Sequence, residues 1–93
     1  MDSVATIPTA NGSKYLQQLC KHWSHKFEVS FDPAAGTIPF PTSVLHLAAS
    51  PEALTLTLTA PDAAVFDRME GVVIEHLQRF AFREELKADW VRA

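Results

Sequence analysis

The chain has 93 residues, of which 47% are hydrophobic and 20% charged, so it has room for one domain with one core. Eleven acidic residues against eight basic ones give a net charge of −3, which argues against a nucleic-acid-binding module. Apolar runs are far too short for a membrane span, no signal peptide is visible, and a single cysteine excludes an internal disulfide. These features predict a cytoplasmic protein.

The first quarter of the chain predicts a tail followed by a helix. Residues 1–12 have little periodicity and are expected to form a flexible tail, ahead of a single domain over residues 13–93. Ser13 is placed as the N-cap of a helix that ends around residues 24–26. Apolar side chains at helical spacing form one stripe along it: Leu16, Leu19, Cys20, Trp23 and Phe27.

The middle of the chain alternates with a period of two, which predicts four strands. The first covers residues 27–31. The second, over residues 37–40, is expected to be short and either at an edge or irregular, because Pro39 has no N–H to donate. Two more follow over residues 44–49 and 54–59, the last a leucine–threonine alternation that buries one face. In the first strand three apolar side chains are expected to face inward: Phe27, Val29 and Phe31.

A second helix follows the strands. Pro61 and Asp62 mark its first turn, and its apolar stripe is wide, as expected of a helix lying across a sheet. The stripe comprises Val65, Phe66, Met69, Val72, Val73, His76, Leu77 and Phe80. Gly71 lies outside the stripe and costs about 1 kcal/mol relative to alanine unless it permits a close approach. Residues 82–93 again show helical spacing, so either this helix continues or a short final helix follows.

The element order α-β-β-β-β-α with hairpin-length connections predicts an α+β two-layer sandwich. A four-stranded antiparallel meander is flanked by the N- and C-terminal helices on one face. The other face is polar and is expected either to be solvated or to contact a second copy, giving a monomer or a homodimer. It carries Glu28, Ser30, His46, Thr55, Thr57 and Thr59.

Three histidines and the cysteine are the candidate functional side chains. His76 lies within an apolar stripe, so it is either a structural histidine bonded to a backbone carbonyl or a ligand. With His22 and His25 it forms a candidate zinc or iron site, provided that the end of the first helix lies beside the second. Cys20 is a further metal ligand, the nucleophile of a thiol enzyme, or simply a packed side chain.

The sequence offers no catalytic constellation. Its three glycines are isolated, so no phosphate-binding loop is present, and the Gly-x-Ser-x-Gly pattern is absent. The aromatic side chains are candidates to line a pocket between the helices and the sheet, but in a chain this short most of them are needed for the core. We therefore assign no catalytic residue and expect any site to be small, polar and near the helix ends.

The chain resembles the bacterial family called domain of unknown function 2218 over about residues 10–91. The resemblance is carried by two stretches, Tyr15–Phe27 and His76–Leu86, together with Gly36-Thr37-Ile38 and Trp90. The family pattern includes histidines at the positions of His22, His25 and His76. Some members are encoded beside, or fused to, siderophore-interacting flavin reductases.

The resemblance therefore implies an accessory or binding module linked to iron or siderophore handling, with such a reductase as a partner. Two other functions stay open from the residues alone. One is a metal-dependent or thiol enzyme that uses Cys20, His22, His25 and His76, and the other is a structural homodimer module.

Overall fold

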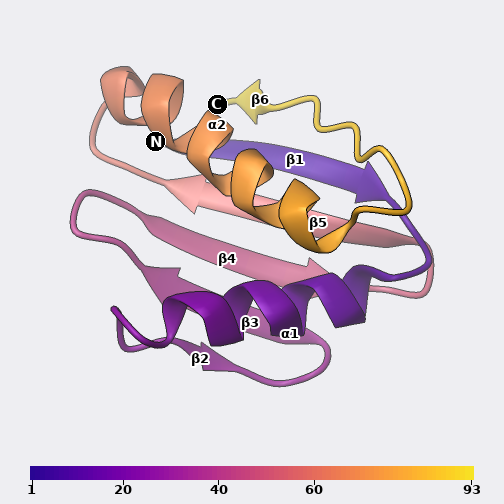
Figure 1. The fold of residues 1–93 in the computed structure, drawn as a ribbon. Coiled ribbons are helices and arrows are strands. Elements are labelled where there is room, and N and C mark those ends of the chain that lie inside the picture. Colours follow the sequence, from indigo (N-terminus) through magenta and orange to yellow (C-terminus); the bar gives the residue numbers. More distant parts are fainter.

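In the computed structural model, which describes residues 1–93, one antiparallel sheet of six strands is covered by two helices (Figure 1). The elements in chain order are β1 (Asp2–Pro8), α1 (Gly12–Trp23), β2 (Ser30–Phe31), β3 (Ala35–Pro39), β4 (Val44–Ala49), β5 (Ala53–Thr59), α2 (Ala63–Phe80) and β6 (Val91–Arg92). The strand order in the sheet is β2-β3-β4-β5-β1-β6. The α+β class is confirmed, but the sheet has six strands rather than the predicted four.

The clearest alternation in the sequence forms the centre of the sheet. In β5, Leu54, Leu56 and Leu58 are fully buried, while the threonines between them face the other side. In the pairing with β4, Leu45 stands opposite Leu58, so the leucines of both strands lie on one face. This face carries the core.

The prediction of a flexible tail over residues 1–12 is wrong, because residues 2–8 form β1. β1 pairs with β5 along its whole length. Its Ser3, Ala5 and Ile7 are fully buried on the core face. The small side chains of Ser3 and Ala5 give little hydrophobic signal in the sequence. The segment forms a strand because it pairs with β5.

The helical structure expected over residues 82–93, as a continuation of the second helix or as a short final helix, is also wrong. α2 ends at Phe80. Beyond this point the Gln78 side chain, instead of the helical backbone, makes the hydrogen bonds to the following residues. Its Nε2 donates to two backbone carbonyls beyond the helix, and its Oε1 accepts a backbone N–H farther along. The chain then leaves the helix and reaches β6, which pairs with β1.

A cluster of charged groups fixes β6 against α2. The Arg92 guanidinium donates to both carboxylate oxygens of Glu70, at 3.1 and 2.8 Å, and its Nη2 lies 2.8 Å from Oδ1 of Asp67. The buried Ser3 hydroxyl donates to the same Glu70 carboxylate. The hydrogen bond from Arg92, together with the weaker effect of Ser3, holds the pKa of the Glu70 carboxyl below its usual range.

The predicted first strand is shorter than expected, since only Ser30–Phe31 pair as β2. Phe27 and Val29 are half-buried against the core, whereas Phe31 is 37% exposed at the edge of the sheet. β2 pairs only with residues 36–37 of β3. The end of β3 at Pro39 therefore has no neighbour on that side, and its missing N–H leaves no broken hydrogen bond.

The two helices begin differently. Ser13, predicted as an N-cap, lies inside α1, and Asn11 occupies the cap position without a side-chain hydrogen bond. The Ser13 hydroxyl instead donates to the carbonyl of Pro33, which ties α1 to the turn before β3. α2 starts as predicted, because the Asp62 carboxylate accepts from the N–H of Val65.

Both helices lie on the same face of the sheet (Figure 1). Twenty buried hydrophobic residues form one core between the two layers. The opposite face is left uncovered, with exposed His46 and Thr59 and half-exposed Thr55 and Thr57. Neither helix is both long enough and apolar enough to span a membrane.

Gly36 marks a close approach of the sheet to α1. A Cβ at this position would lie 2.8 Å from Sγ of Cys20 and 3.2 Å from Cβ of Phe31. We predict that Gly36→Ala lowers the free energy of unfolding by about 1–3 kcal/mol in urea denaturation, because the added methyl group overpacks this contact.

Gly71→Ala is the matched control, since nothing lies within 4 Å of a Cβ at this helical position. It should raise the free energy of unfolding by roughly 0.5–1 kcal/mol, the ordinary difference in helix propensity. Equal effects of the two substitutions would contradict the packing described for Gly36.

The lowered pKa of Glu70 predicts that its stabilising effect depends on pH. Above the ordinary carboxyl pKa near 4.5 the stabilisation is fully present, and it is lost as the pH falls through the lowered pKa of the folded state. The difference in Tm between the wild type and Glu70→Gln should therefore be largest above about pH 5 and shrink in more acidic buffer. Glu85→Gln, which changes an exposed carboxylate outside the cluster, is the control; a Glu70→Gln effect that is the same at every pH would refute the ionic contribution.

Candidate functional site

Two of the three predicted histidines meet where the last turn of α1 lies against α2. The ring centroids of His22 and His76 are 5.5 Å apart. Trp23 packs between the same elements, with its ring centroid 4.9 Å from that of His76 and 5.8 Å from that of His22. The condition that the end of the first helix lies beside the second is therefore met.

His25 and Cys20 do not join this pair. His25 follows α1 in an exposed turn and has no ring contact with the other histidines, and Cys20 is buried beside Gly36 of β3. No group of three or more histidine, cysteine, aspartate or glutamate side chains is arranged to hold a metal ion. Zinc or iron binding by His22, His25 and His76 stays a prediction from the sequence.

Cys20 has the environment of a packed side chain. It is fully buried, and this burial raises the pKa of its thiol to about 11. The thiolate is the form that attacks substrates or binds metals, and a thiol with this pKa stays protonated at neutral pH. Of the alternatives for Cys20, the structure favours simple packing in the core.

His76 makes the backbone hydrogen bond expected of a structural histidine. Its Nδ1 lies 2.7 Å from the carbonyl oxygen of Val72, one turn earlier on α2. Because a carbonyl only accepts, Nδ1 carries the proton and donates it. In the neutral ring this leaves a lone pair on Nε2, so the ring is held in one tautomer.

The electrostatic surroundings of His22 disfavour its protonated form. Burial and, next, the neighbouring His76 lower the pKa of His22. Smaller effects in the same direction come from three further groups: Arg79, Lys26 and His25.

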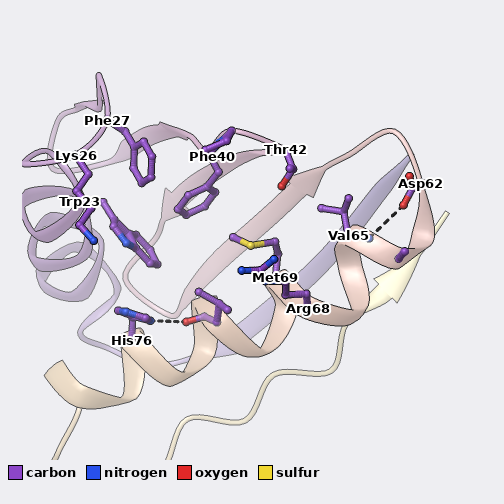
Figure 2. Close-up of a pocket in the computed structure, with 13 residues that line it drawn as sticks. Trp23, Lys26, Phe27, Phe40, Thr42, Asp62, Val65, Arg68, Met69 and His76 are labelled. Carbon is purple, nitrogen blue, oxygen red and sulfur yellow. Dashed lines mark hydrogen bonds between the residues drawn. The ribbon is translucent and has the colours of Figure 1, made fainter.

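A groove of about 670 Å³ lies beside this cluster, between the end of α1, the end of β3 and the length of α2 (Figure 2). Three aromatic side chains form one wall. The ring of Phe40 lies 4.9 Å from that of Trp23 at an interplanar angle of 90°, and 5.4 Å from that of Phe27 at 80°. The other wall is α2, which contributes Ala64, Val65, Arg68, Met69, Val72 and His76.

The charged side chains of the groove are two cations and one carboxylate. Lys26 follows α1 and Arg68 belongs to α2, so the cations come from opposite walls. Neither makes a salt bridge, because all salt bridges of the protein involve Arg79 or Arg92. The carboxylate is that of Asp62, which already caps α2. The groove thus combines an aromatic wall with two unpaired cations.

The groove differs from the small polar site expected from the sequence. Seven of its thirteen lining residues are hydrophobic. The sequence analysis missed Lys26 and Arg68 and favoured a core position for Phe40. The one signal that pointed to it is the width of the α2 stripe. Val65 and Val72, on one side of that stripe, remain half-buried after the helix has packed on the sheet.

The arrangement defines the class of protein: a small two-layer α+β domain in which a ligand-sized groove opens between the helices and the end of a strand. The family described as "Uncharacterized protein conserved in bacteria (DUF2218)" matches residues 4–91, and the chain belongs to this family. The resemblance stated from the sequence is thereby confirmed.

Among solved structures, the chain is similar to the NMR structure of PA4090 from Pseudomonas aeruginosa. The two chains share 39% sequence identity with a TM-score of 0.82, and the match covers 99% of this chain and 96% of the other. No curated protein matches the chain.

The contact between the two histidine rings makes a prediction about titration. His76→Phe keeps an aromatic ring beside Trp23 but removes a group that can become charged, so the pKa of His22 should rise toward its ordinary value. Histidine titrations followed by NMR measure this change. His46→Gln, on the uncovered face of the sheet, is the control, and a His22 pKa that responds to neither substitution would contradict the coupling.

Proposed function

We propose that this domain is a non-catalytic binding module whose groove holds a small molecule with an apolar body. The observation that carries the proposal is the groove between the aromatic side chains and α2, in which three apolar lining residues, Phe27, Val65 and Val72, are only half-buried (Figure 2).

The size of the groove supports this function. A volume of about 670 Å³ lies within the range of roughly 300–1,000 Å³ that is common for small-molecule sites. Trp23, Phe40 and Met69 are each more than nine-tenths buried, so the core holds these parts of both walls in place before any ligand arrives. Such preorganisation lowers the entropy cost of binding.

The chemistry of the walls supports an apolar ligand. Val65, Val72 and Phe27 line the groove and are only half-buried. A ligand that covers them removes apolar surface from water, which contributes about 25 cal/mol for each Å². An aromatic ring of the ligand can pack against these side chains in the same edge-to-face geometry that they adopt with one another.

The predicted link to iron or siderophore handling rests on the family resemblance and stays a prediction, as does a siderophore-interacting flavin reductase as a partner. A module that binds a small molecule is compatible with an accessory role beside such an enzyme. The homodimer alternative also stays a prediction.

The two tryptophans provide the test. Trp23 lines the groove, and Trp90 does not. When the ¹⁵N-labelled protein is titrated with unlabelled indole, an uncharged aromatic probe, the indole N–H signal of Trp23 should shift and saturate while that of Trp90 stays in place. Absence of a saturating Trp23 shift at millimolar indole would refute the proposed function.

A pair of neighbouring alanines gives the matched control. Ala64 and Ala63 are both exposed in the first turn of α2, but only Ala64 lines the groove. Ala64→Trp should weaken the binding of indole several-fold by obstructing the groove, and Ala63→Trp should leave it unchanged. The same affinity in both variants would mean that the probe binds elsewhere.

A further inference from the structure

We infer that the ligand of the groove is a small aromatic monocarboxylate whose charged end is held by Arg68, with Lys26 adding a second positive charge to the groove. This inference rests on the proposed function and adds the chemical class of the ligand.

The two cations lack partners in an otherwise acidic protein. The chain has a net charge of −3, yet neither Lys26 nor Arg68 is paired with any of its eleven carboxylate side chains. They face one groove from its two walls, one after α1 and the other on α2. Two like charges at a shared concave surface create a local positive potential that attracts an anion.

The charges of the lining favour a single negative charge on the ligand. Lys26 and Arg68 stand against one carboxylate, Asp62, which leaves one positive charge in excess. Asp62 also occupies the N-terminus of α2, where it accepts a hydrogen bond from Val65. A phosphate dianion would meet that carboxylate rather than a free helix N-terminus, so this groove suits a carboxylate better than a phosphate.

The two walls would bind different parts of the ligand, one charged and one apolar. The guanidinium of Arg68 is a planar fork of donors that matches the two oxygens of a carboxylate, and Lys26 adds a mobile point charge. The edge-to-face rings of Phe40 with Trp23 and Phe27 form the apolar wall. An aromatic ring attached to a carboxylate by a short link meets both requirements at once.

A matched pair of probes tests this inference on the full chain. Indole-3-acetate and indole-3-acetamide have nearly the same shape and differ by one charge. Titrations followed at the Trp23 indole N–H should give an affinity for the acetate about two- to fivefold higher at low salt, the range expected for an exposed ionic contact. The difference should shrink as sodium chloride screens the charges.

Charge-matched variants assign the preference to the groove. Arg68→Gln should remove most of the preference for the acetate, whereas Arg79→Gln removes a cation of the same helix outside the groove and should keep it. Lys26→Gln should reduce the preference, and Lys21→Gln, an exposed position on α1, should not. Binding of the uncharged acetamide should be unchanged in the two control variants, Arg79→Gln and Lys21→Gln, and circular dichroism shows whether all four variants are folded.

The outcomes separate this inference from the proposed function. Equal affinities for the two probes would overturn the monocarboxylate inference and leave the apolar binding site intact. A preference that survives both Arg68→Gln and Lys26→Gln would overturn it as well, because the anion would then be bound by other residues. If neither probe shifts the Trp23 signal, the inference and the proposed function both fail.

Discussion

The pairing of β1 with β5 positions the two helices that border the groove. Seven residue pairs hold β1 inside the sheet, and only three residues then separate Pro8 from the start of α1 at Gly12. α1 begins so close to the sheet that a Cβ on Gly12 would lie 3.0 Å from the carbonyl oxygen of Ala53. The other edge of β1 receives β6, which brings Arg92 to Glu70 on α2. The position of one strand therefore fixes one end of α1 and one side of α2, and with them the groove between the two helices.

The parts of the fold that could be predicted from the sequence are those whose signals are local. The leucine–threonine alternation of β5, the apolar stripe of α1 and the cap at Asp62 each lie within a few neighbouring residues. β1 and β6 lack such signals, because β1 buries Ser3 and Ala5 and β6 has only two residues. The end of α2 depends on Gln78, whose hydrogen bonds beyond the helix are a consequence of the tertiary fold. Helical spacing beyond that point was therefore misleading.

The candidate site also has parts that could be predicted from the sequence and parts that could not. The apolar stripe of the second helix singled out His76, and His22 was its candidate partner near the end of the first helix. The packing of the helices brought the two together. The contribution of His25 could not be judged from spacing, because it depends on the residue at which α1 ends. The aromatic wall could not be predicted from the sequence for a different reason. Its three side chains come from different segments, and each has the pattern of a core residue: Trp23, Phe27 and Phe40. Only their arrangement in space shows that all three line one groove.

The shortness of the outermost strands has a consequence for how copies of this protein behave when concentrated. β2 and β6 have two residues each, so neither edge of the sheet offers a long row of unpaired backbone groups. The strands next to them, β3 and β1, extend beyond these short partners and end at Pro39 and Pro8, which have no N–H to donate. A strand from another molecule would find few consecutive hydrogen-bonding sites at either edge. The sheet is thereby protected against edge-to-edge aggregation even though its threonine-bearing face is uncovered.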